Sequence, residues 1–237
     1  FNGISDNPSV HGYKGPLDIR QAPRKVPRSA RKFVKAVEQA TGYREILDYN
    51  NPNTPIGPFT RWQLSQKPNG LRESSSTALL NLDVMTPEGI GVNRRKLRVL
   101  YKSTALKIIF KNKTAVGVEF LREGVYKRAF ASKKVIICAG INSAQLLLLS
   151  GIGPAQELRK NNVPIVFNNP NVGNNLTNHT FNTATMTMNH SDANELLQDP
   201  YSLFSGGAFL PIPLLDADKN IRGVRLIGRY SNGNFNI

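Results

Sequence analysis

The feature that most constrains the fold is the unbroken apolar run Lys134–Ala139, which ends at Gly140. Such runs are typical of a strand buried on both faces of a parallel sheet. A helix is expected directly afterwards, with Asn142 or Ser143 as its N-cap and Gln145–Leu149 as its body. Gly140 has no Cβ, and a helix start offers unpaired N–H groups. The pattern therefore predicts a strand–turn–helix unit whose backbone a phosphate or ring can approach.

The residues after this unit predict further short elements. Ser150–Gly153 stops the helix, and Pro154 starts a second one through Lys160, because proline is favoured at the first helical position. Val163–Phe167 then reads as a strand, followed by the Asn-rich loop 168–179. Spacing alone leaves open whether this region belongs to an α/β nucleotide-binding fold.

The rest of the chain shows local patterns. Apolar residues at helical spacing predict a helix from Ser29 that Gly42 ends. The Asn-, Pro- and Gly-rich residues 48–70 are expected to form a loop rather than a core element, and residues 183–188 alternate Thr and Met in an extended pattern. We predict strands at Leu97–Tyr101, Ala105–Phe110, Ala115–Phe120 and Val125–Ala131, with a hairpin turn at Lys111–Lys113.

The charge is strongly positive and unevenly distributed. The formal net charge is +15, and residues 1–135 hold 25 Lys and Arg against 10 Asp and Glu, whereas residues 136–237 hold 6 of each. Such an excess fits a nucleic acid, an anionic substrate or an acidic partner. It also fits a solvated surface whose balancing acidic residues lie elsewhere. The scattered positions of the basic residues favour the solvated surface.

Cysteine content and hydropathy exclude some classes. Cys138 is the only cysteine, so an intrachain disulfide is impossible. Its place in an apolar run predicts a buried, inert thiol. No apolar run approaches the ~20 residues that a membrane-spanning helix requires, so no membrane partner is expected.

Two segments carry a family resemblance. Ala139–Pro154 closely resembles the second signature of glucose–methanol–choline (GMC) oxidoreductases, and Asn171–His179 resembles the segment that follows it in that family. Weaker matches fall in the family's order at His11–Leu17, Gly70–Ser75 and Leu97–Phe120. The resemblance covers most of residues 11–180. It implies that the chain is an internal portion of a longer enzyme.

The resemblance implies a mixed α/β and α+β fold. A doubly wound FAD-binding domain would alternate with a substrate domain built on an antiparallel sheet. Residues 93–180 would belong to the FAD domain, and residues 1–92 and 181–237 mainly to the substrate domain.

The resemblance also implies a set of residues that contact FAD. Ala105 matches a position whose backbone meets the adenine ring, although an ordinary strand residue is an equal reading. Ala139 and Gly140 match small residues that line the nucleotide. Asn178 and His179 lie in a loop that runs close to the flavin.

Sequence departures and missing regions limit what the chain can do. The family usually has one more small residue after the position of Gly140, a Pro in place of Ala144 and an Asp in place of Asn178. Its phosphate-cradling glycine motif would precede this chain, and its catalytic His would follow it. None of the histidines here matches that catalytic position, so no residue is assigned as catalytic and the fragment alone is expected to be inactive.

The resemblance implies that the intact protein oxidises a small-molecule alcohol. A base takes the hydroxyl proton while hydride passes from the substrate carbon to flavin N5. The remainder of the same protein would then be the chain's partner. Some family members are lyases that keep the flavin without redox turnover. The alternative is a catalytically degenerate scaffold or a nucleic-acid-binding protein, which the basic residues and the departures at 140–144 and 178 motivate.

Overall fold

The computed structural model divides the chain into two compact units. Unit 1 comprises Phe1–Val84 and Phe181–Ile237, and unit 2 comprises Met85–Thr180. The structure describes residues 1, 3–21, 26, 28–53, 56–178, 185–187, 204–215, 221–231 and 234–236.

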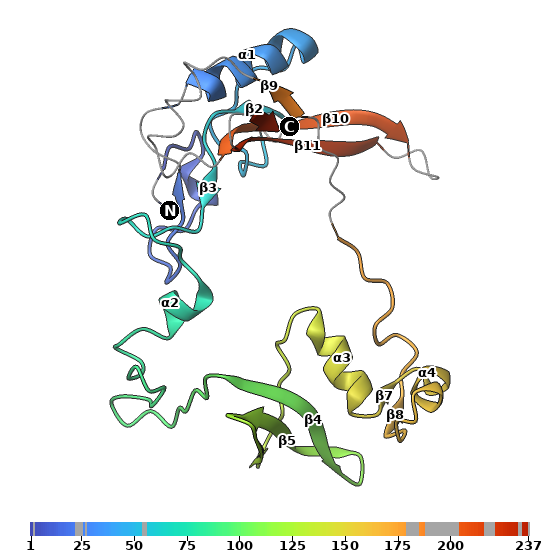
Figure 1. The fold of residues 1–237 in the computed structure, drawn as a ribbon. Coiled ribbons are helices and arrows are strands. Elements are labelled where there is room, and N and C mark those ends of the chain that lie inside the picture. Colours follow the sequence, from blue (N-terminus) through green and yellow to red (C-terminus); the bar gives the residue numbers. More distant parts are fainter. Residues whose placement is uncertain are drawn as a thin grey trace. The chain divides into compact units, whose positions relative to one another are not determined.

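Unit 1 is built on an antiparallel sheet (Figure 1). The strand order is β2-β10-β11-β12-β9, with bounds Gly57–Phe59, Phe204–Leu215, Ile221–Ser231, Asn234–Asn236 and Thr185–Thr187. Its smaller elements are η1 (Pro8–Val10), the pair β1 (Arg20–Gln21) and β3 (Gln63–Leu64), and α2 (Ser75–Leu79). The extended pattern expected at residues 183–188 is confirmed for Thr185–Thr187 by β9, and the other residues of that range lie outside the described ones.

The helix α1, Arg28–Thr41, packs against β10 and confirms the helix predicted from its spacing. Phe33, Val34 and Val37 lie on one face and are buried with Ala208 of β10. Gly42 ends the helix at φ +78, donating its N–H to the Glu38 carbonyl. An apolar stripe on a helix and the pleated face of a strand thus form one small core cluster of unit 1.

The prediction that residues 48–70 form only a loop is wrong. They contain β2 and β3, and Phe59 and Trp62 are buried. Both rings pack near Gly207, where a Cβ would come within 2.6 Å of each. Trp62 Nε1 donates to the Gly206 carbonyl at 3.0 Å. Gly57–Phe59 forms a strand because it pairs with β10, about 150 residues away, and local composition carries no trace of such a partner.

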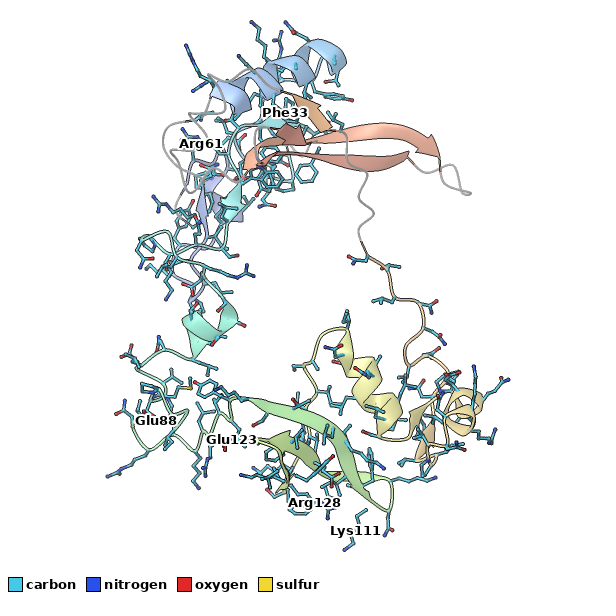
Figure 2. The ribbon with its side chains drawn as sticks, in the orientation of Figure 1. Phe33, Arg61, Glu88, Lys111, Glu123 and Arg128 are labelled. Atoms are coloured by element: carbon cyan, nitrogen blue, oxygen red, sulfur yellow. The ribbon has the colours of Figure 1, made fainter. Side chains whose placement is uncertain are left out.

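Unit 2 begins with an antiparallel meander of β4 (Ser103–Lys111), β5 (Thr114–Arg122) and β6 (Val125–Phe130). These strands confirm three of the predicted ones. Asn112 and Lys113 form the predicted hairpin turn with φ values of +50 and +65, the left-handed pair that a two-residue turn needs. Figure 2 shows Lys111 at the end of β4, next to this turn.

The rest of unit 2 is helical with one short parallel pair. The helix α3 spans Asn142–Leu149 and α4 spans Ala155–Lys160, as expected from the sequence. Between and after them, β7 (Ile152–Gly153) pairs in parallel with β8 (Phe167–Asn168). The strand predicted at Val163–Phe167 is therefore reduced to its last residue and Asn168.

Two predicted strands do not form. Leu97–Tyr101 is irregular, because the Leu97 carbonyl and Val99 N–H pair instead with Gly91 and Gly89 in a short loop. Lys134–Ala139 is irregular as well, and Ile136 is 79 % exposed. The expected buried thiol is also wrong, since Cys138 is exposed. A central strand needs neighbours on both edges, and within the described residues no strand pairs with this run.

Candidate cofactor-binding site

The turn before α3 is the centre of the candidate site. Ala139 and Gly140 are exposed there. The carbonyls of Ala139 and Gly140 accept the N–H groups of Asn142 and Ser143, each at 3.1 Å. The Ala139 N–H in turn donates to Ser143 Oγ at 3.1 Å. The residues from 139 to 143 thus form a closed turn that holds two small residues at the surface.

The predicted N-cap is wrong in detail. The N-cap of α3 is Ile141, and no side chain caps the helix there. The Ser143 hydroxyl instead reaches back to Ala139, since a serine at the second helical position can accept an N–H from the preceding turn.

Gly140 is needed for its backbone conformation. Its φ is +58, which costs energy for any residue with a Cβ. A Cβ placed there would meet no atom within 4 Å, so the space beside the turn is open. An exposed turn of small residues with open space is what a flat cofactor needs for close approach to the backbone. These residues fit the group that the family resemblance implies.

Ala105 lies on β4 beside a β-bulge. The register passes from Ala105↔Phe120 directly to Lys107↔Glu119, so Leu106 is an extra residue. Ala105 is exposed, and β4 is an edge strand of its sheet. Bulges bend a strand, re-aim its side chains and are common next to binding sites. Ala105 is therefore an exposed residue at an irregularity of this strand.

A buried serine joins these two segments. Ser150, directly after α3, accepts the Ile108 N–H of β4 at 2.8 Å and donates to the Leu146 carbonyl at 2.6 Å. The structure thereby links the strand of Ala105 to the helix that follows Gly140. Sequence reasoning placed this serine only in a helix stop, and nothing in its neighbours indicated the contact with β4.

The loop after β8 contributes the remaining predicted residue within the described region. Gly173 has φ +82, and its Cβ position lies 3.8 Å from Leu148 of α3. A pocket of about 550 Å³ lies between this loop and α4, with Glu157 and Lys160 on its wall. Asn178 is exposed near the end of the loop. His179 lies outside the described residues.

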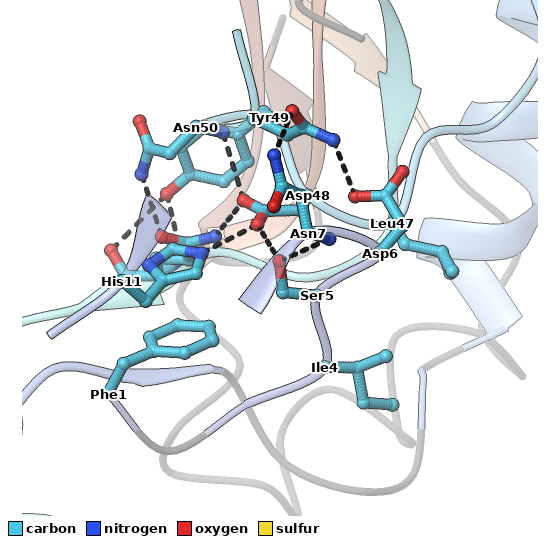
Figure 3. Close-up of polar contacts among 12 residues, drawn as sticks. Phe1, Ile4, Ser5, Asp6, Asn7, His11, Leu47, Asp48, Tyr49 and Asn50 are labelled. Atoms are coloured by element: carbon cyan, nitrogen blue, oxygen red, sulfur yellow. Dashed lines mark hydrogen bonds and ion pairs between the residues drawn. The ribbon is translucent and has the colours of Figure 1, made fainter. Parts of the chain in front are cut away.

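A second polar cluster lies in unit 1 and is centred on Asp48 (Figure 3). Asp48 is fully buried. One carboxylate oxygen lies 2.6 Å from His11 Nε2 and accepts the Ser5 hydroxyl at 2.5 Å. The other accepts Gln63 Nε2 at 2.6 Å and the Asn50 N–H at 3.0 Å. His11, expected only in a turn, thus ties the first residues of the chain to the segment around β3.

The electrostatics of this cluster indicate a structural role. Burial raises the pKa of Asp48, but the hydrogen bonds from Ser5, His11, Asn50 and Gln63 outweigh it and hold the pKa below its usual value. Each carboxylate oxygen already has two partners, so its acceptor sites are used by this chain. The cluster stabilises the N-terminal segment of unit 1.

The described residues lack two further kinds of feature. No group of three or more His, Cys, Asp or Glu side chains there is placed to hold a metal ion. None of the helices in that part of the chain has the length and hydropathy to cross a membrane.

Comparison with known proteins decides the family. The profile described as GMC oxidoreductase matches residues 6–181. The chain belongs to the GMC oxidoreductase family. It is 35% identical over 170 residues to the mitochondrial choline dehydrogenase of Homo sapiens, covering 71% of this chain and 26% of that protein. It is 33% identical over 181 residues to the ecdysone oxidase of Bombyx mori, covering 74% and 25%. This GMC chain therefore spans about a quarter of the length of these relatives.

Solved structures agree with the family assignment. Pyridoxine 4-oxidase from Mesorbium loti aligns with a TM-score of 0.57 and 26% identity, over 68% of this chain and 29% of that one. A formate oxidase aligns with a TM-score of 0.66 over 87% and 38%, and its 18% identity supports the fold alone. The predicted fold class, a portion of the FAD-binding fold together with antiparallel sheet, is confirmed. FAD is the cofactor of this family domain.

Proposed function

We propose that the protein containing this chain oxidises a small-molecule alcohol, with FAD as hydride acceptor at N5. The family match over residues 6–181, together with the exposed turn at Gly140, is the observation that carries the proposal. The relatives' names include a choline dehydrogenase and a pyridoxine 4-oxidase, whose substrates are small molecules that carry hydroxyl groups.

The roles of this chain's own residues follow from their positions. Ala139 and Gly140 present backbone without bulk, so they bind and orient the nucleotide half of FAD. Ala105, at the bulge of β4, supplies backbone for the adenine ring. Asn178 and His179 are assigned to the flavin end of the cofactor. The boundaries proposed from the family are residues 93–180 for the FAD domain, and residues 1–92 and 181–237 for the substrate domain.

No residue of this chain is assigned as the catalytic base. The base and the phosphate-cradling glycine motif belong to the remainder of the protein, so the chain alone is proposed to be inactive. Electrons therefore move only in the assembled protein, where the substrate carbon loses hydride and its hydroxyl loses a proton to that base.

The test is the visible absorbance spectrum of the whole protein, recorded before and after anaerobic addition of a panel of alcohols. A flavin band that bleaches with one alcohol supports the proposal and identifies the substrate class. A bound flavin that no alcohol bleaches contradicts alcohol oxidation and favours a lyase. A matched sample of this chain alone, supplied with FAD and the same alcohols, is expected to show no bleaching.

The second candidate is a scaffold that binds nucleic acid. Residues 85–180 hold 15 Lys and Arg against 4 Asp and Glu, an excess that attracts polyanions. Its test is DNA binding at two salt concentrations, since counterion release makes such affinity fall steeply with salt. A protein without flavin that binds DNA in this salt-dependent way would replace the enzyme proposal.

A further inference from the structure

We propose that Ser150 is a positioning residue for FAD. Its hydroxyl fixes the end of α3 to β4, and it thereby sets the spacing between the two segments assigned to the nucleotide, Ala105 on β4 and the turn at Ala139–Gly140. The inference rests on the proposed cofactor contacts and adds to them a residue that touches no cofactor itself.

Ser150 forms hydrogen bonds to both α3 and β4. The residue is 1 % exposed and stands as the C-cap of α3, with φ −91 and ψ 1. Its Oγ donates to the Leu146 carbonyl at 2.6 Å and accepts the Ile108 N–H at 2.8 Å. Its own N–H donates to the carbonyls of Leu146 and Leu147 at 3.2 and 3.0 Å. One side chain thus satisfies groups on both elements.

The bond to β4 has a clear physical reason. β4 is an edge strand, and Ile108 is buried, so its outward N–H would lack a partner if the serine were absent. A buried donor without an acceptor is costly. A serine that bonds the carbonyl four residues back slightly weakens its helix, so that bond alone does not favour serine here. The contact with the strand is what favours it.

Ser150 affects the two proposed cofactor-binding segments through the rigid elements α3 and β4. The eight residues of α3 extend about 12 Å from Ser150 back to the turn at Gly140, at 1.5 Å per residue. Along β4, Ala105 lies three residues from Ile108, or about 10 Å. The bulge at Leu106 lies between these two residues. A small shift at the Ser150–Ile108 hydrogen bond therefore moves the turn at Gly140 relative to Ala105.

Apolar packing between α3 and β4 does not provide the same control. Each dispersion contact is weak and non-directional, so it fixes a position less sharply than a hydrogen bond does. A hydrogen bond requires a short distance and a near-linear angle. The Ser150 bond therefore sets where along β4 the helix end sits.

The test compares Ser150→Ala with the matched control Asn161→Ala. Asn161 is the C-cap of α4, and its Nδ2 donates to the Glu157 carbonyl four residues back, at 2.9 Å. Removing it takes away the same kind of bond at a helix end without the bond to β4. FAD dissociation constants are measured by flavin fluorescence on the whole protein, with the thermal midpoint of the apoprotein and the amide exchange rate of Ile108 recorded alongside.

We expect Ser150→Ala to weaken FAD binding by about tenfold and to speed exchange at Ile108, and Asn161→Ala to leave both within about twofold. Ser150→Thr, which keeps the hydroxyl, should restore most of the affinity. If Ser150→Ala fails to fold, Ser150→Cys, a weaker hydrogen-bonding group of similar size, should bind FAD less tightly than Ser150→Thr.

Unchanged FAD affinity in Ser150→Ala, together with a lowered thermal midpoint, would overturn the inference and leave Ser150 a purely structural residue. Equal affinities of the Cys and Thr variants would do the same. Wild-type protein that takes up no FAD would contradict the cofactor contacts of the proposed function as well, so the two failures are distinguishable.

Discussion

The Asp48 cluster and the turn at Gly140 differ in their burial and in the space around them. Asp48 is fully buried, and each of its carboxylate oxygens has two partners from the chain itself. The turn at Gly140 is exposed, carries no side-chain cap and faces open space. A buried carboxylate that its own chain satisfies stabilises the fold, whereas an exposed turn of small residues leaves room for a ligand beside its backbone.

The largest effect is expected from Asp48→Asn. The amide cannot accept from all of the donors around it, so unit 1 should lose about 3 kcal/mol of stability. FAD affinity should stay unchanged. Chemical denaturation measures the free energy of unfolding, and fluorescence titration measures the FAD affinity. Glu119→Gln breaks an exposed ion pair with Arg128 and should cost no more than about 1 kcal/mol. A lower FAD affinity in Asp48→Asn would contradict the assignment of a purely structural role to the Asp48 cluster.

Acid should act on the same cluster. The pKa of Asp48 is lower in the folded state than its ordinary value of 3.8, because hydrogen bonds outweigh burial. Its contribution to stability is therefore complete above about pH 4 and is lost as the pH falls through the folded pKa. Thermal midpoints measured from pH 6 to pH 2 should show this loss in the wild type. The Asp48→Asn variant should show a shallower decline, and parallel curves would contradict the assignment.

Gly140→Ala tests the open turn against a matched hairpin glycine. Gly140 and Gly124 have φ values of +58 and +76, and both would place a Cβ in open space. Each alanine variant should lose about 1 kcal/mol of stability from backbone strain alone. Only Gly140→Ala should also weaken FAD binding. Equal FAD affinities in the two variants would contradict the proposed contact between Gly140 and FAD.

The smallest effect is expected from Cys138→Ser. The thiol is exposed, so the change in unfolding free energy should stay within about 0.5 kcal/mol. A thiol reagent should label Cys138 of this chain rapidly without denaturant. Labelling that requires denaturant would show that the run 134–139 is buried after all, as its apolar sequence suggests.

Elements built from local contacts were predictable from the sequence. The helix α1 follows from its apolar spacing, and the β4–β5 hairpin follows from alternating residues around Asn112 and Lys113. The glycine turn before α3 was predicted for its small residues, and the family resemblance was carried by the segment around it. These features depend on neighbours within a few residues.

Features that depend on distant partners were not predictable. The strand β2 exists because β10 pairs with it, and its Pro- and Gly-rich sequence resembles a loop. The reverse holds for Lys134–Ala139, which has the composition of a central strand without paired neighbours in the described residues. Ser150 and Asp48 look like ordinary turn residues, because their roles are defined by Ile108 and His11 across the fold.

The most direct test of the central claim is amide hydrogen exchange of the whole protein with and without FAD. The account predicts slower exchange on FAD binding around residues 139–143 and at Ala105, with no change at the Asp48 cluster. Protection that is absent from the turn and the strand, or that appears instead around Asp48, would contradict it.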